Sequence, residues 1–202
     1  MANHQYRMET DQSLVSGALS GEMNAFRDIV KLTEKVTADI CFKMIINAED
    51  RKDVVQDIYL KAWKNLAGFR FQSRLTTWLA QIAYNTCLNY LNRKKFSSVT
   101  DVKEIDHEYQ PEYNNGLLLA SSITDAETLL SQSETKHILA SAIDRLPPVY
   151  KTLITLFHYH DISYEEIAVI TSLPVGTVKS YLYRARKTLK ECLLTQYKKE
   201  EL

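Results

Sequence analysis

The chain has 202 residues, enough for one large domain or two small ones. With 45% hydrophobic and 25% charged residues, its composition is globular and excludes an intrinsically disordered chain. Lysine and arginine total 25, as do aspartate and glutamate, so the net charge is zero.

No apolar run approaches the roughly 20 residues of a membrane span. The opening residues, MANHQYRMETDQS, lack the apolar core of a signal peptide. We therefore expect a cytoplasmic protein without membrane insertion.

The neutral total conceals an uneven distribution of charge. Residues 1–95 hold 14 Lys/Arg against 10 Asp/Glu, residues 96–135 hold one against eight, and residues 136–202 hold 10 against seven. No acidic residue occurs between Asp57 and Asp101, and residues 176–190 carry five basic residues and no acidic one. Such clustering indicates local surfaces that bind a polyanion.

Apolar residues at helical spacing predict a helical first domain. The segment 14–46 has this spacing around Phe26, Ile29, Val30, Val36, Ile40 and Met44. A second stripe comprises Val54, Val55, Ile58 and Ala62, with Tyr59, Trp63 and Leu66 beside it. A third comprises Trp78, Leu79, Ile82, Ala83, Leu88 and Leu91. We expect three or more helices packed on these stripes, since no period-two alternation typical of strands stands out.

Three cysteines, Cys41, Cys87 and Cys192, lie far apart in the sequence, and none belongs to a C-x-x-C pair. Each falls in an apolar helical stretch. Together with the expected intracellular location, this predicts reduced, buried thiols in preference to disulfides or zinc ligands. Redox sensing by Cys87 stays open, although no residue near it in the sequence argues for it.

Residues 96–134 predict an acidic linker of mixed order, because they lack sustained periodicity and contain Pro111 and the breaker Asn114-Asn115-Gly116. Helical pattern resumes near Glu134. Further on, Leu146-Pro147-Pro148 is expected to end one helix and to open the next, because proline is tolerated at a helix start.

The segment 163–189 predicts a helix-turn-helix. Ser163 and Glu166 have the spacing of a capping box, and the run from Thr171 to Pro174 breaks the first helix. A second helix begins by Gly176 or Thr177. Its expected buried stripe is Val178, Leu182, Ala185 and Leu189. The other faces are basic, which suits entry into the major groove of DNA. The alternative is a helical hairpin whose basic face is only solvated.

Two segments resemble the sigma-70 family, in its small extracytoplasmic-function (ECF) group. Residues with the motif DVVQDIYLKAW are similar to sigma region 2, and those with PVGTVKSYLYRAR are similar to sigma region 4. The resemblance implies an all-α protein with region 2 at 1–95, the acidic linker at 96–134, and region 4 at 135–202. It also implies a transcription initiation factor that is no enzyme and needs no cofactor or metal. Its implied partners are core RNA polymerase (clamp and flap), promoter DNA and an anti-sigma factor.

Asp53, Gln56 and Asp57 are spaced i, i+3 and i+4, so they share one helix face opposite the apolar stripe. The resemblance implies that this face docks on the polymerase clamp. The residues expected there are Asp53, Gln56, Asp57 and Lys61. A pair of metal-binding carboxylates and a plain solvated face are the alternatives, but no further metal ligand converges at motif spacing.

Aromatic and basic side chains interleave after Gly68, as strand separation requires. By resemblance, the loop at 69–75 captures a flipped base of the downstream (−10) element, and the following helix contacts the adjacent DNA. The expected DNA-binding residues are Phe69, Arg70, Phe71, Arg74, Thr77, Trp78, Tyr84, Asn85, Asn89, Arg93 and Lys94, together with Tyr90 and Lys95. Phe69 and Trp78 are equally expected as core residues. Phe71-Gln72 stands where many relatives carry Gly-Asp, and Leu75 where many carry an aromatic residue.

The second helix of the helix-turn-helix is expected to read the upstream (−35) element. Its candidate residues are Thr177, Lys179, Ser180, Tyr181, Tyr183, Arg184 and Lys187. Lys179, Ser180 and Arg184 match the family pattern. Tyr181 stands where many relatives have arginine, and it lacks the bidentate guanidinium.

Two other functions are weighed beside this one. A LuxR-like regulator would pair the helix-turn-helix with a phospho-acceptor or ligand domain, which the first 95 residues do not resemble. A metal-dependent nuclease would use Asp53 and Asp57. The chain contains no G-x-x-x-x-G-K-[ST] motif for nucleotide hydrolysis, so melting would depend on binding energy.

Overall fold

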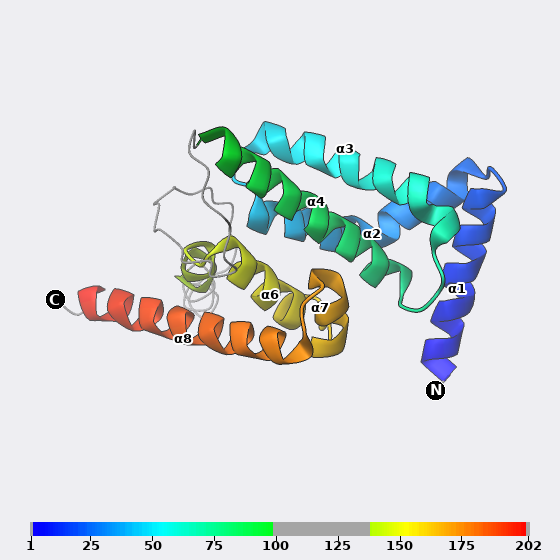
Figure 1. Cartoon of the computed structure of the whole chain (residues 1–202). Helices are drawn as coiled ribbons and strands as arrows, with labels where there is room; N and C mark the ends of the chain where they lie inside the picture. The colour runs from blue at the N-terminus through cyan, green and yellow to red at the C-terminus, as the bar shows by residue number, and fades with distance from the viewer. Residues whose placement is uncertain (1, 99–137, 201–202) are drawn as a thin grey trace, which may run out of the picture.

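A computed structural model describes residues 2–98 and 138–200, and all regular structure in these two stretches is helical (Figure 1). The helices are α1 (Ala2–Leu19), α2 (Met23–Met44), α3 (Ala48–Asn65), α4 (Leu75–Ser98), α6 (Pro148–Tyr159), α7 (Tyr164–Thr171) and α8 (Val175–Glu200). A short 3-10 turn, η1 (Leu66–Gly68), follows α3, and residues 138–144 form one further helical segment. The predicted all-α fold is confirmed for the described residues.

Two helical units follow one another along the chain. We call α1–α4 the N-terminal unit, and residues 138–144 with α6–α8 the C-terminal unit. The predicted linker at 96–134 lies outside the described residues, except for its first three positions, which continue α4 to Ser98. The predicted return of helix near Glu134 also lies outside them. As expected, the prolines separate two helices, and α6 begins at Pro148.

The N-terminal unit is organised around α2, which packs against α1, α3 and α4. Its core includes Ile29, Ile40, Ile58 and Leu79, all fully buried. Burial of each such side chain contributes about 1.5–3 kcal/mol, which is why the apolar stripes decide the packing. The predicted stripes are confirmed with one exception. The Trp63 side chain is 48% exposed and only packs edge-on against Phe26, with ring centroids 4.8 Å apart.

Two side-chain caps set the starts of α3 and α4. The Asn47 side chain accepts hydrogen bonds from the backbone N–H groups of Glu49 and Asp50, which satisfies two free donors at the start of α3. At the start of α4, the Leu75 N–H donates to Asp11 Oδ2 over 2.9 Å. Asp11 belongs to α1, so a carboxylate 64 residues away caps the helix.

The C-terminal unit packs α6 against α7 and α8 around Leu153, Leu156, Ile167 and Ile170. From the stripe predicted for α8, Val178, Leu182 and Ala185 are fully buried. Leu189, expected to be buried, is only half-buried, because α8 extends beyond the helices that cover its first turns. Cys192, one turn further, is also half-buried, so the prediction of three buried thiols holds only for Cys41 and Cys87.

The two units lie against each other, with α7 on α4 and α6 on α2 (Figure 1). Ion pairs cross this boundary, including one from Lys43 Nζ to Asp144 Oδ1 over 2.7 Å. No helix within the described residues is long and apolar enough to cross a membrane.

Candidate nucleic-acid interface

The helix-turn-helix predicted at 163–189 forms from α7 and α8. Ser163 Oγ accepts from the Glu166 N–H over 3.2 Å, and Glu166 Oε2 accepts from the Ser163 N–H over 3.2 Å, which completes the predicted capping box. Ser172 ends α7 in the left-handed region at φ 58°, and the Leu173 N–H bonds back to the Ala168 carbonyl. This turn ends α7 and lets α8 begin on its own axis while the two helices stay packed together, the arrangement of a helix-turn-helix.

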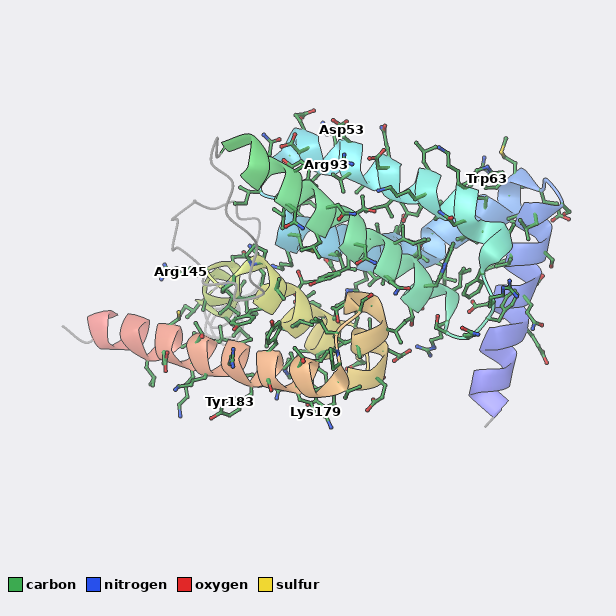
Figure 2. The ribbon with its side chains drawn as sticks, in the orientation of Figure 1. Asp53, Trp63, Arg93, Arg145, Lys179 and Tyr183 are labelled. Atoms are coloured by element: carbon green, nitrogen blue, oxygen red, sulfur yellow. The ribbon has the colours of Figure 1, made fainter. Side chains whose placement is uncertain are left out.

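The outer face of α8 carries the basic side chains. Opposite the buried Val178, Leu182 and Ala185, the exposed residues are Lys179, Ser180, Tyr183, Arg184, Arg186 and Lys187. Thr177 is half-buried at the start of the helix. Tyr181 is half-buried against Tyr150, with ring centroids 5.7 Å apart, so its ring is partly engaged in packing. Figure 2 shows Lys179 and Tyr183 projecting from α8 on the side away from the other helices.

The carboxylate face predicted on α3 is exposed. Asp53, Gln56 and Asp57 all face solvent, whereas Val54, Ile58 and Ala62 on the opposite side of α3 are buried. Lys61 is also exposed, and its Nζ donates to Thr86 Oγ1 on α4 over 3.2 Å. In Figure 2, Asp53 projects from the outer side of α3, at the opposite edge of the molecule from Lys179.

An aromatic cluster lies between η1 and α4. The Phe69 ring contacts those of Phe71 and Trp78, with centroids 4.7 and 5.1 Å away. Phe69 is buried and Phe71 and Trp78 are half-buried, while Arg70 and Arg74 are exposed. Phe71 has φ 54°, a left-handed conformation that costs free energy for an aromatic residue. The cluster thus combines packing with a constrained loop that carries two exposed cations.

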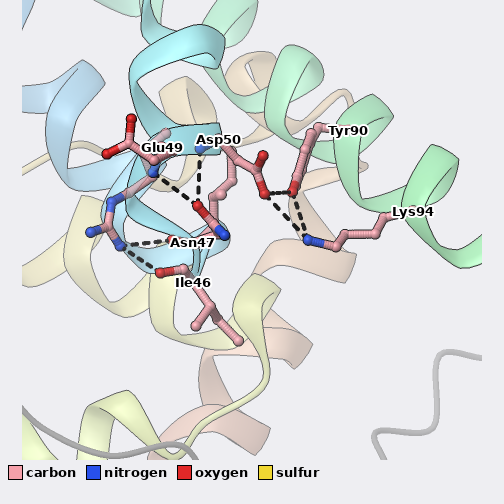
Figure 3. Close-up of polar contacts among 8 residues, drawn as sticks. Ile46, Asn47, Glu49, Asp50, Tyr90 and Lys94 are labelled. Carbon is pink, nitrogen blue, oxygen red and sulfur yellow. Dashed lines mark hydrogen bonds and ion pairs between the residues drawn. The ribbon is translucent and has the colours of Figure 1, made fainter.

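Near the C-terminal end of α4, Tyr90 and Lys94 contact Asp50 at the start of α3, and we call these contacts the clasp (Figure 3). The Tyr90 hydroxyl donates to Asp50 Oδ2, and Lys94 Nζ lies 3.3 Å from the same oxygen. The Tyr90 hydroxyl and the Lys94 ammonium hold the pKa of Asp50 below its usual value. Hydrogen bonds to the Tyr90 hydroxyl and to Asp50 raise the pKa of Lys94. Lys94 is therefore paired, whereas Asn89 and Arg93 beside it are exposed and Asn85 is half-buried. The Lys95 side chain, also predicted to bind DNA, lies outside the described part of the structure.

Two of the predicted DNA-binding residues on α4 lie beneath the C-terminal unit. Thr77 is 3% exposed, and its hydroxyl donates to Glu166 Oε1 on α7 over 3.4 Å. Tyr84 is 3% exposed, and burial, with a smaller contribution from nearby Tyr181, raises its pKa to about 12. Sequence patterns gave no sign of this cover, because it depends on how two separate units pack. Gln81, which was not among the predicted site residues, also contacts the C-terminal unit, because its Nε2 donates to Oγ of Ser172 at the end of α7.

Among the described residues, no group of three or more His, Cys, Asp or Glu side chains could hold a metal ion. Asp53 and Asp57 lie on an open helix face.

Known protein families match both units. The profile described as "Sigma-70 region 2" matches residues 34–97, and that described as "Sigma-70, region 4" matches residues 136–189. The ECF RNA polymerase sigma-E factor of Haemophilus influenzae is 36% identical over 180 residues, covering 89% of this chain and 93% of that protein. The factor of the same name from Escherichia coli K12 is 36% identical over 183 residues, covering 89% and 92%.

Two solved structures share the fold. One is CnrH in complex with the cytosolic domain of CnrY, with a TM-score of 0.61, 23% identity, and coverage of 92% of this chain and 98% of that chain. The other is the sigma factor RpoE from Bartonella quintana in complex with the anti-sigma factor NepR, with a TM-score of 0.57, 24% identity, and coverage of 83% and 94%.

A helical protein whose two units match sigma regions 2 and 4 in that order is a sigma factor by class. More particularly, the chain belongs to the ECF group of the sigma-70 family. It is an RNA polymerase sigma factor that directs transcription initiation through core polymerase and promoter DNA, and it is not an enzyme. This assignment confirms the sigma-factor interpretation over the LuxR-like and nuclease alternatives.

Proposed function

We propose that three exposed surfaces of this sigma factor have separate binding functions. The outer face of α3 docks on the polymerase clamp, the loop at 69–75 with α4 binds and opens the −10 element, and α8 binds the −35 element. The observation that carries the proposal is the two-sidedness of α8, which buries Val178, Leu182 and Ala185 and exposes its cations on the opposite side.

The chemistry of α8 supports contact with both bases and phosphates. Lys179 and Ser180 lie in the first two turns, which enter the groove most deeply in helix-turn-helix proteins. Arg184 and Lys187 follow one and two turns later, where cations meet the phosphate backbone. Lys179 Nζ lies 5.6 Å from the centre of the Tyr164 ring, so α7 steadies this cation without neutralising it.

The cluster of Phe69, Phe71 and Trp78 supports capture of an unstacked base. Opening a base step costs about 1.4 kcal/mol of stacking. Contact between a base and an aromatic ring returns about 1–3 kcal/mol. Phe71 is already held in a left-handed conformation, so little reorganisation is needed when a base arrives. Arg70 and Arg74, both exposed, can hold the phosphates on either side.

The cover over Thr77 and Tyr84 implies that the two units separate before α4 meets DNA. The polar contacts between α4 and α7 are long, at 3.4 Å from Thr77 to Glu166 and 3.5 Å from Gln81 to Ser172. Such contacts are weak. Docking each unit on its own site of core polymerase would overcome them, and tethering would let two weak DNA contacts act as one specific contact.

An anti-sigma factor is a further proposed partner. CnrH and the RpoE of Bartonella quintana, which share this fold, were solved with CnrY and with the anti-sigma factor NepR. We also propose cytoplasmic action, where core polymerase operates, and the division into region 2 at 1–95, linker at 96–134 and region 4 at 135–202.

The test is reconstitution of the chain with core RNA polymerase on a library of promoter sequences. Mapping of transcript start sites should yield one shared pair of upstream and downstream elements that requires this chain. Start sites that do not change when the chain is left out would overturn the proposal.

A further inference from the structure

Two thiols that are far apart in the sequence meet in the core of the N-terminal unit. Cys41 Sγ, on α2, lies 3.7 Å from Cys87 Sγ, on α4, across 46 residues of sequence. Both side chains are buried, with 1% and 0% of their surface exposed. At this distance the two sulfur atoms are in contact, and no other atom fits between them.

The surroundings make the two thiols unequal. Cys41 and Cys87 share a hydrogen bond in which either thiol can be the donor. Hydrogen bonding to Cys87, with a smaller contribution from the nearby Arg51 guanidinium, lowers the pKa of Cys41 in spite of its burial. Its bond to Cys41 and its burial raise the pKa of Cys87, which keeps its proton. The thiolate is the reactive form of cysteine. Cys41 lies in the last turn of α2 with the Arg51 guanidinium nearby, so we take it as the nucleophile and Cys87 as its resolving partner.

Cys41 also lies close to the C-terminal end of α2. It occupies the last turn of α2, which ends at Met44, and its carbonyl accepts from the capping N–H of Ile45. The turn that follows is held by Arg51, which donates to the carbonyls of Ile45 and Ile46. Fraying of a final helical turn costs far less than global unfolding, so a small oxidant reaches Cys41 without loss of the fold.

We propose that Cys41 and Cys87 form a reversible, peroxide-driven disulfide that joins α2 to α4. The Cys41 thiolate attacks one oxygen of a hydroperoxide, the O–O bond breaks, and the leaving alkoxide or hydroxide takes up a proton. Cys41 is then a sulfenic acid. The Cys87 sulfur attacks the Cys41 sulfur, the S–O bond breaks, and water leaves with the proton of Cys87. Two thiols lose two electrons, which the peroxide accepts.

The geometry favours this outcome over further oxidation. A disulfide has an S–S distance of about 2.05 Å, so the two sulfurs approach by less than 2 Å, within reach of a side-chain rotation and a slight helix shift. The cross-link would close a loop of 46 residues, which restricts the unfolded chain and stabilises the N-terminal unit. This site is independent of the promoter-binding roles proposed above, because neither sulfur reaches the surface.

The test uses the full chain carrying Cys192→Ser, which removes the half-buried thiol that could pair between molecules. The reduced protein is treated with hydrogen peroxide, quenched, unfolded and alkylated with iodoacetamide. We expect both remaining thiols to escape alkylation, a Cys41–Cys87 linked peptide in the non-reducing digest, and full recovery of both thiols with dithiothreitol. The urea midpoint of the oxidised protein should exceed that of the reduced protein.

The companion variant is Cys87→Ala/Cys192→Ser, in which Cys41 has no resolving partner. Peroxide should then yield a Cys41 product that dithiothreitol only partly reverses, and no rise in the urea midpoint. In the unsubstituted chain, full alkylation of Cys41 and Cys87 at a peroxide dose that has already oxidised Cys192 would overturn the proposal. So would a linked peptide joined to Cys192, or a cross-link that lowers the urea midpoint.

Discussion

His160, at the end of α6, lies with its Nε2 2.8 Å from Asp39 Oδ2 in the C-terminal half of α2. The His160 side chain is 11% exposed and the Asp39 side chain 34%, so this contact between the two units is partly shielded from water. Together with Lys43–Asp144, it holds the C-terminal unit over the surface of α4 that contains Thr77 and Tyr84.

We predict that Asp39→Ala loosens this closed arrangement. A hydrogen bond to a charged group in a partly buried site is worth about 1.5–3 kcal/mol, and its loss leaves His160 without its carboxylate. Amide hydrogen exchange in the first half of α4 and in α7 should accelerate by roughly tenfold or more. Asp28→Ala, on the same helix but paired with Lys31 in solvent, is the control and should leave both segments unchanged. Equal exchange in the two variants would contradict a holding role for the contact.

Charge reversal on the outer face of α8 should abolish promoter-specific transcription. In Lys179→Glu/Arg184→Glu, two exposed cations that we propose contact DNA become anions, while the buried stripe is untouched. Transcription from the cognate promoter should fall more than tenfold, with core polymerase binding unchanged. Lys31→Glu/Lys35→Glu makes the same charge change on exposed positions of α2 and should retain transcription. An equal loss of core binding in the α8 variant would count against the assignment.

Charge reversal on α3 should act on polymerase instead. Asp53→Lys/Asp57→Lys replaces two exposed carboxylates, and affinity for core polymerase should fall at least tenfold if this face meets a basic partner helix. Asp28→Lys/Glu34→Lys places the same charges on exposed positions of α2 and serves as the control. Competition binding against a labelled wild-type factor measures the change. Full affinity in the α3 variant would show that another face docks.

The capping box of α7 should contribute measurably to stability. Ser163→Ala removes the acceptor for the Glu166 N–H and one half of the reciprocal bond, at a cost of about 1 kcal/mol. Urea unfolding followed by circular dichroism measures the loss. Ser163→Asn keeps a capping oxygen and should recover most of it. If both variants unfold like the natural chain, the cap is irrelevant to stability.

The clasp between α3 and α4 should make stability depend on pH at the acidic end. The pKa of Asp50 in the folded protein is held below its ordinary value of 3.8. The contribution of Asp50 to the free energy of unfolding is therefore fully present above pH 3.8, and it is lost as the pH falls through the lowered pKa. Tyr90→Phe removes the main partner, so the Tm difference from wild type should be largest near neutral pH and shrink below about pH 4. Tyr59→Phe loses a hydroxyl that faces the neutral Thr33 and should show no such trend. A Tyr90→Phe effect that is constant with pH would contradict the assignment.

Much of the fold is readable from local sequence signals. The capping box from Ser163 to Glu166 and the buried spacing of Val178, Leu182 and Ala185 involve neighbours within a few residues, where helical geometry alone decides which side chains meet. For the same reason, the exposure of Asp53, Gln56 and Asp57 opposite Val54 and Ile58 follows from the helical period. Trp63 shows the limit of this reasoning, because spacing assigns it to the apolar side and packing leaves it half in solvent.

What the sequence by itself determined is therefore the set of helices, their buried faces and, through two motifs, the family. Only the tertiary structure decided that Asp11 caps α4, that Thr77 and Tyr84 are covered by the C-terminal unit, and that Cys41 touches Cys87. These contacts join residues 46 to 89 positions apart. Their formation depends on how whole helices pack, which is settled by the sum of many small burial energies and leaves no pattern in any local stretch of sequence.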